Sequence, residues 1–286
     1  MDGLVQFYEG YGLKDDSGFG YECDNDVRGI DVSEMSISDD NVASELKRKW
    51  VPDEEIGAWL DNDELDRPTR HRPLHTLRVM WITLVDGSLD ISRLNLDKVL
   101  GQFQMAMPYA YCSSASVGVA SFPGASKEPG EDGQTKVYCF FDHGIVGCMV
   151  WAYNSAKRVT NGVVIALPIR LKRLQEYLTC QKLLISHPMA MAHAFVSMYE
   201  LRIADLLDQE KVKVQGVERR TGLHTWNINP QLKVAEGNYS ALSAKMSSCA
   251  TSLTDLKRSL KVTREYLAFL SQNSDFEVID DGYVTP

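Results

Sequence analysis

Residues 242–270 read LSAKMSSCATSLTDLKRSLKVTREYLAFL. Apolar or small side chains recur in this stretch at alternating spacings of four and three residues, which is the heptad pattern of a helix that packs along a partner helix. The members of this heptad seam are Leu242, Met246, Cys249, Leu253, Leu256, Leu260, Thr263, Leu267 and Leu270. At about 1.5 Å per residue the predicted helix is about 45 Å long, and it is the strongest structural signal in the chain.

Two partners fit the heptad seam equally well. In the first interpretation, Leu253, Leu256, Leu260 and Leu267 form an assembly surface, and copies of the chain associate through this helix. In the second, the seam packs against apolar positions between residues 171 and 207 of the same chain and forms a helical hairpin within a monomer. The pattern alone does not decide between these interpretations.

Changes in composition divide the chain into four segments. Residues 1–26, rich in Gly, Asp and aromatic residues, are predicted to be a loosely ordered lead-in. Residues 27–168 are predicted to form a mixed α/β sheet domain, residues 169–272 a helical unit that ends in the heptad helix, and residues 273–286 an acidic tail. Strands followed by helices indicate the α+β class, with an α/β/α-type sheet domain before the helical unit.

Runs rich in Val, Ile, Thr and aromatic residues predict the strands of the sheet domain. They cover residues 27–35, 77–84, 116–122, 136–142, 144–154 and 159–167. One helix is predicted at residues 94–103, and another on the apolar spacing of Val42, Leu46, Trp50, Ile56, Trp59 and Leu60. In the helical unit, Ser186 is predicted to cap a second long helix that starts near Pro188 and ends before Gly222.

Composition narrows the classes of function. The 286 residues are 44% hydrophobic and 24% charged, as in an ordinary globular protein. The longest apolar run, residues 145–153, is about half of the about 20 residues that a transmembrane helix requires, so we expect no membrane span. The six cysteines contain no C-x-x-C pair, and no secretory signal precedes them, so we expect free thiols in a cytoplasmic protein.

Acidic residues are concentrated at the N-terminal end. Residues 1–66 contain 19 of the 39 acidic side chains but only 5 of the 30 basic ones. No basic stretch is long enough to indicate phosphate contacts, so no nucleic-acid partner is expected. Acidic runs such as residues 61–66 could bind Mg²⁺ or Ca²⁺, but none has the spacing of a calcium loop. A solvated acidic surface is the simpler interpretation.

Several stretches together carry a family resemblance. They are LRVMWITL (residues 77–84), QFQMAMPYAY (102–111), SVGVASF (116–122), AYNSAKRVTNGVVIALP (152–168) and SHPMAMAHAFVSMYELRIADLLDQEKVKVQGVERRTGLHTW (186–226). Their order, and a helix that starts at His-Pro and ends at an acidic residue shortly before Thr-Gly, resemble the N-terminal domain of fungal CorA-like proteins. The resemblance spans about residues 27–272 and rests on loose motifs and the order of elements.

The resemblance implies a soluble α/β/α domain at the cytosolic face of a membrane, followed by a long stalk-like helix. Magnesium channels of the CorA type add two C-terminal transmembrane helices and a Gly-Met-Asn motif at the pore. Gly-Met-Asn does not occur here, and residues 271–286 are polar and acidic, so we expect no transport by this chain alone. The chain is then either the soluble part of a longer protein or a stand-alone relative without the channel.

Mg²⁺ is the one cofactor that the resemblance implies. Regulatory sites in such channels involve acidic residues between neighbouring soluble domains, and no residue of this chain matches them one to one. Our candidates for metal ligands are Asp205, Asp208 and Glu210, near the end of the second long helix.

Each catalytic template lacks a required member. The chain contains no G-x-S-x-G, no P-loop and no G-x-G-x-x-G after a strand. His187 and His193 are six residues apart and do not share a helix face, as zinc ligands on one helix must. His143, in a predicted turn, and His224, in a connector, remain as candidates for a general base, each without a visible orienting partner. Cys112 is interpreted as a buried thiol.

Two functions follow from these observations. The first is a non-catalytic, self-associating CorA-like domain that binds Mg²⁺ or a protein partner. The second is a small-molecule enzyme with a pocket between the sheet and the helices that uses His143 or His224. The first is favoured because no catalytic template is complete.

Overall fold

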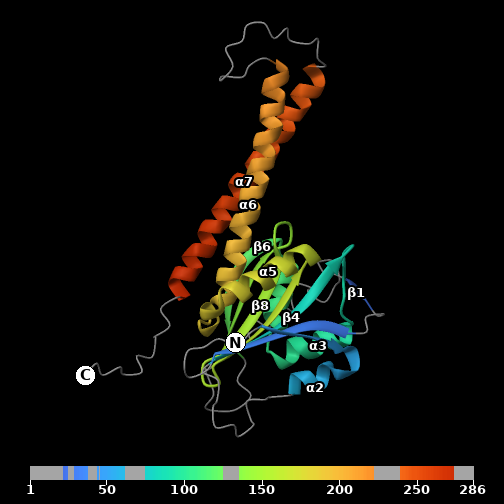
Figure 1. Ribbon diagram of the computed structural model, residues 1–286, viewed down its shortest axis with the longest axis vertical. Coiled ribbons are helices and arrows are strands. Elements are labelled where there is room, and N and C mark those ends of the chain that lie inside the picture. The colour runs from blue at the N-terminus through green and yellow to red at the C-terminus, as the bar shows by residue number, and fades with distance from the viewer. Residues whose placement is uncertain are drawn as a thin grey trace, which may run out of the picture. The chain divides into compact units, whose positions relative to one another are not determined.

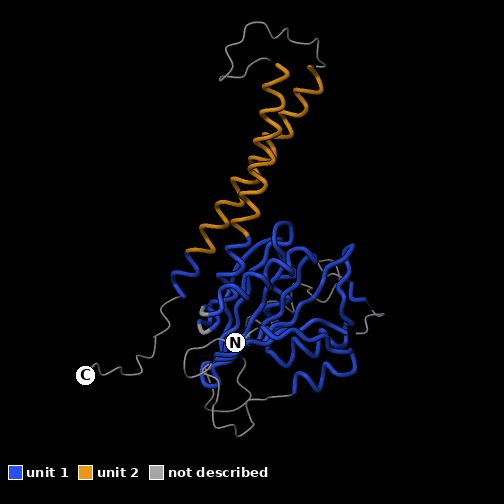
Figure 2. Tube along the Cα trace, in the orientation of Figure 1, with its two compact units in different colours: residues 1–198, 268–286 blue, residues 199–267 orange. Residues whose placement is uncertain are grey.

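The computed structural model describes residues 22–24, 29–37, 44, 46–61, 75–124, 135–221 and 239–273, without the side chains of residues 183 and 186. It divides the chain into two compact units (Figure 2). Unit 1 comprises residues 1–198 and 268–286, and unit 2 comprises residues 199–267. The predicted boundary after residue 168 lies inside unit 1, because the helical segments that directly follow it cover one face of the sheet.

A mixed sheet forms the centre of unit 1 (Figure 1). Its strands are β1 (Glu22–Cys23), β2 (Gly29–Ile37), β3 (Lys47–Pro52), β4 (His75–Val85), β5 (Ser88–Leu89), β6 (Val117–Pro123), β7 (Thr135–Asp142), β8 (Gly147–Asn154) and β9 (Val159–Ala166). The spatial order is β3-β2-β4-β9-β8-β7-β6, and β5 and β1 continue the sheet from the end of β4. β4 runs parallel to β9, and most other neighbours are antiparallel.

Helices lie on both faces of this sheet, and the last two of them, α6 and α7, also supply the described residues of unit 2. They are α2 (Ile56–Asp61), α3 (Arg93–Gln102), α4 (Ala106–Ser114), α5 (Pro168–Cys180), α6 (Ala190–Thr221) and α7 (Tyr239–Asn273), with the 3₁₀ turns η1 (Asp53–Glu55) and η3 (Lys182–Ser186). Together with the mixed sheet they confirm the predicted α+β class. None of the described helices combines the length and the apolarity that crossing a membrane requires.

One face of the sheet carries a contiguous apolar core. Because successive strand residues point to opposite faces, Val137, Cys139 and Phe141 of β7 share this face with Val163 and Ile165 of β9. α2, α3 and α4 cover it with apolar side chains: Ile56, Trp59, Leu60, Leu96, Val99, Leu100 and Cys112. The alternating pattern that predicted the strands therefore also produces this core.

Arg78 of β4 is buried beneath α2. Its Nε donates a hydrogen bond to Glu34 Oε1 at 3.0 Å, and its Nη2 donates to the carbonyl oxygen of Trp59 at 2.6 Å. The guanidinium carbon also lies 4.4 Å from the centre of the Trp59 ring. Because a buried charge is costly without such partners, this arrangement ties α2 to the sheet.

The opposite face of the sheet is covered by α5, by η3 and the first turns of α6, and by the last residues of α7. Figure 1 shows α5 lying across the strands on this side. Phe140 of β7 packs against Phe195 and Phe269, with ring centres 5.7 and 5.4 Å apart. Gly162 of β9 permits the close approach of α6, because a Cβ at this position would lie 3.1 Å from Met191 Cε. The sheet domain therefore has the three layers of an α/β/α arrangement.

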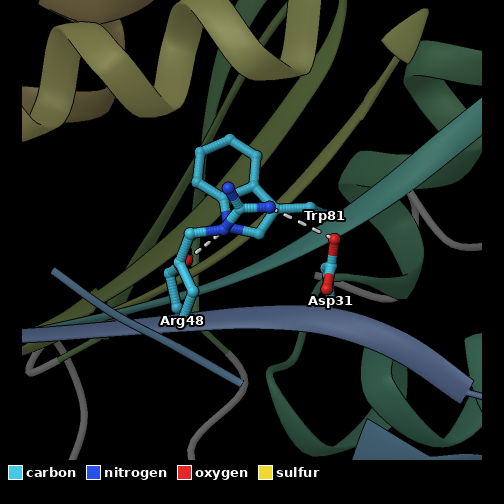
Figure 3. Close-up of polar contacts among 4 residues, drawn as sticks. Asp31, Arg48 and Trp81 are labelled. Carbon is cyan, nitrogen blue, oxygen red and sulfur yellow. Dashed lines mark hydrogen bonds and ion pairs between the residues drawn. The ribbon is translucent and has the colours of Figure 1, made fainter. Parts of the chain in front are cut away.

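The helix predicted across residues 42–60 is wrong for residues 47–52, which form the strand β3. Residues 47–52 pair with β2 as an edge strand, with Asp31 opposite Trp50, and the helical pattern holds only for α2. Val51 precedes Pro52, and a residue before proline avoids the helical region. Arg48 Nη2 lies 3.4 Å from Asp31 Oδ2, and Trp81 donates to Ser33 Oγ on the same face of the sheet (Figure 3).

The segment predicted as a loosely ordered lead-in also contains a strand. Glu22–Cys23 forms β1, which pairs with β5, and the amide of Asp24 donates to the carbonyl of Leu89 at 2.9 Å. Residues 1–21, Val42 and the acidic tail from residue 274 lie outside the described residues.

Candidate functional site

Unit 2 contains two described helical segments, which run antiparallel (orange in Figure 2). They are the part of α6 that begins at Tyr199 and the part of α7 that ends at Leu267. The rings of Tyr199 and Tyr266 meet edge to face at 5.3 Å, and farther along the pair Glu210 faces Cys249. The heptad helix therefore does form an internal hairpin.

The heptad seam of α7 is nevertheless split into two columns. The first column is buried, with 1–9% of each side chain exposed, and contains Leu242, Cys249, Leu256 and Thr263. The second column is exposed to 41–51% and contains Met246, Leu253, Leu260 and Leu267. We call this second column the leucine stripe. Members of each column are seven residues apart, so each column follows one side of the helix.

Hydroxyl-bearing side chains accompany the buried column on the inner side of α7. Ser252 and Ser259 are half-buried and Tyr266 is buried, and each lies three residues after a member of that column. The leucine stripe lies four residues after the same members, on the side that turns away from the hairpin. The hairpin thus buries one column of the heptad seam together with these side chains and leaves a second, continuous row of apolar side chains outside.

A buried carboxylate lies inside the hairpin and is paired with a partly exposed lysine. The Nζ of Lys213 is 2.5 Å from Oε1 of Glu210, whose side chain is buried. The hydrogen bond from Lys213 lowers the pKa of Glu210, and Cys249 and Ser252 of α7 lower it further. A buried polar group in an apolar seam favours one alignment of the two helices, because another alignment would remove Glu210 from its contacts with Cys249 and Ser252 of α7.

The three predicted metal ligands do not come together. Asp205 and Asp208 are exposed on α6, whereas Glu210 points into the hairpin and is paired with Lys213. Within the described ranges, no group of three or more His, Cys, Asp or Glu side chains is placed to hold a metal ion.

Of the two candidate general bases, only His143 belongs to the described residues, and its contacts are structural. His143 lies in the turn between β7 and β8, and its Nε2 is 2.9 Å from the carbonyl oxygen of Cys112. His224 falls outside the described residues. His187 accepts a hydrogen bond from the amide of Met189 at 3.1 Å, so the histidine ring meets a free amide at the start of α6. The side chain of Ser186, the predicted cap, lies outside the described residues.

Sequence reasoning missed a buried histidine at the start of β4. His75 Nε2 lies 3.1 Å from Thr160 Oγ1 of β9, and the His75 ring stacks on Tyr153 at 5.8 Å. Burial lowers the pKa of His75, the positive charges of Arg158 and His187 add to this effect, and together they bring the pKa to about 4. A single histidine before a strand has no pattern that would have indicated this burial.

Three thiols lie together in the core beneath α4. Cys112 of α4 contacts Cys139 of β7 and Cys148 of β8, and all three are buried. Burial raises the pKa of Cys112 well above its usual range, and hydrogen bonds with the two other thiols raise it further. Because the thiolate is the reactive form of cysteine, Cys112 is expected to be inert in the folded protein, and burial keeps reagents away from all three thiols.

Thiol labelling tests this assignment. Under native conditions, an aromatic disulfide reagent is expected to react first with the exposed Cys180, whereas Cys112, Cys139 and Cys148 react only after unfolding. The rate is followed by absorbance, and the labelled cysteines are identified by peptide mass spectrometry. In a Cys180→Ser variant the fast phase should disappear, and rapid native labelling of Cys112 would contradict the assignment.

Comparison with known proteins does not assign the chain to a family. No model of a known protein family matches it, and no curated protein matches it either. The CorA-like resemblance therefore stays a prediction that rests on the quoted stretches of sequence.

Proposed function

We propose that this chain is a non-catalytic, CorA-like binding and assembly domain whose copies associate through the leucine stripe. The observation that carries the proposal is the exposure of Met246, Leu253, Leu260 and Leu267 in a strict seven-residue repeat on α7. Scattered apolar residues on a surface need no explanation, but a continuous apolar row is typical of an interaction site. A seven-residue repeat suits a partner helix in particular.

Substitution of Leu260 by glutamate tests the proposal. The wild-type chain is expected to give a concentration-dependent molar mass above that of one chain in light scattering. Leu260→Glu should give a folded monomer, because its side chain is exposed in the hairpin and a charge there opposes only the contact between copies.

Leu256→Glu is the matched control, four residues away on the same helix. Leu256 is buried in the hairpin, so this variant should lose at least about 3 kcal/mol of stability as well as helical signal in circular dichroism. A wild-type chain that stays monomeric at every concentration would overturn the proposed assembly.

Divalent-cation sensing is the second part of the proposal, and it rests on the family resemblance. The same scattering experiment is repeated with millimolar Mg²⁺ and, as a control for ionic strength, with an equivalent amount of Na⁺. A molar mass that changes only with Mg²⁺ supports sensing. A mass that is indifferent to Mg²⁺ removes sensing and leaves assembly through the leucine stripe intact.

A further inference from the structure

We infer that the surface that receives the leucine stripe is the outer face of α6 in a second copy of the chain. This inference rests on the proposed assembly and adds the identity of the partner surface. It follows from the distribution of exposed charge on the two helices of unit 2.

The leucine stripe has a basic flank. Three exposed basic residues surround Leu260 in the sequence. Lys257 lies three residues before it, Lys261 one residue after it and Arg264 four residues after it. At about 100° per residue, these offsets place all three on the same side of the stripe, because the buried column occupies its other side. A helix that covers the stripe therefore meets three positive charges along one edge.

The outer face of α6 has the complementary pattern. Leu201 and Val212 are exposed to 56% and 67%, and they are eleven residues apart, which is about three helical turns. Asp205 and Asp208 are exposed between them on the same face. We call these four residues the acidic face of α6. It combines exposed apolar side chains with negative charge, as a partner for the leucine stripe and its basic flank requires.

Charge also disfavours the alternative in which two α7 helices meet. A twofold contact in which the two α7 helices run antiparallel would bring the basic flanks of both copies together, and like charges in contact oppose association. A contact between the leucine stripe and the acidic face joins two different surfaces. Where each copy uses its leucine stripe on one neighbour and its acidic face on another, the contact is heterologous and produces a closed ring or an extended filament.

Charge reversal on each helix tests the inference. The first variant carries Lys257→Glu, Lys261→Glu and Arg264→Glu, and the second carries Asp205→Lys and Asp208→Lys. All five side chains are exposed in the hairpin, so both variants should fold. Each variant alone is expected to associate at least about tenfold more weakly than the wild type, because its two contact surfaces carry charge of the same sign.

An equimolar mixture of the variants should recover assembly to within about threefold of the wild type. In an alternating assembly every contact again pairs opposite charges. The reversed flank of the first variant meets the reversed α6 face of the second, and the next contact pairs the two surfaces that neither variant changes. Sedimentation of the separate and mixed variants at one ionic strength measures these differences.

The outcomes separate this inference from the proposed assembly. A wild-type chain without any oligomer would overturn both. An oligomer that Leu260→Glu disperses but that the α6 variant leaves at wild-type strength would overturn only the inference, and would indicate contact between two α7 helices or with another segment of the chain. Loss of assembly in each variant without recovery in the mixture would also overturn it.

Discussion

Replacing Trp151 by alanine is expected to destabilise the sheet domain by about 3–5 kcal/mol. Trp151 of β8 is fully buried, stacks on Tyr138 with ring centres 5.4 Å apart, and packs at 5.5 Å from Phe140. Its Nε1 donates a hydrogen bond to the carbonyl of Pro188 at 2.9 Å, where the chain enters α6. The substitution removes this hydrogen bond and leaves a cavity between the sheet and the start of α6. The loss of the hydrogen bond and the cost of the cavity therefore add together.

Urea unfolding followed by far-ultraviolet circular dichroism measures the loss. Trp50→Ala is the matched control, because Trp50 lies on the edge strand β3 and more than half of its side chain is exposed. This control is expected to cost less than about 1 kcal/mol. Equal losses for the two variants would show that burial does not determine the contribution of these tryptophans.

Most of the longer strands could be predicted because each of them is a run of residues with a strong pattern. β4, β6, β7, β8, β9 and α3 agree with their predicted ranges to within a few residues. β3 could not be recognised, because its residues Lys47, Arg48, Lys49 and Trp50 are all exposed and show no alternation. Pairing with β2 makes this segment a strand, and such a long-range partner is invisible in a local pattern.

A local pattern was also insufficient to predict how the heptad seam packs at the candidate site. The seven-residue repeat predicted a long helix with a partner, and α7 with its hairpin to α6 confirms that part. Which of two adjacent columns would face α6 depends on the rotation of the helix, and that rotation follows from side chains on both helices. Glu210 illustrates the point, because its contact with Cys249 joins residues that are far apart in the sequence.

Acidification from pH 7 to pH 4 is expected to lower the free energy of unfolding by about 3 kcal/mol through His75 alone. The pKa of His75 is about 4 in the folded protein, against an ordinary value of 6.5. The unfolded chain therefore takes up a proton first as the pH falls, and proton uptake by the unfolded state favours unfolding. Above about pH 6.5 His75 is neutral in both states and costs no stability. As the pH falls from there toward 4, the free energy of unfolding decreases progressively.

The measurement compares urea unfolding of the wild type and of His75→Gln at several pH values between 7 and 4. Glutamine can still bond to Thr160 but does not titrate, so the difference in slope between the two profiles isolates His75 from carboxylates such as Glu210. His193, whose pKa burial also lowers, remains in both proteins and cancels in the comparison. Parallel profiles would mean that His75 is protonated in the folded protein as easily as in the unfolded chain. Such a result would contradict the packing of its ring between Tyr153 and Thr160 in a site that excludes charge.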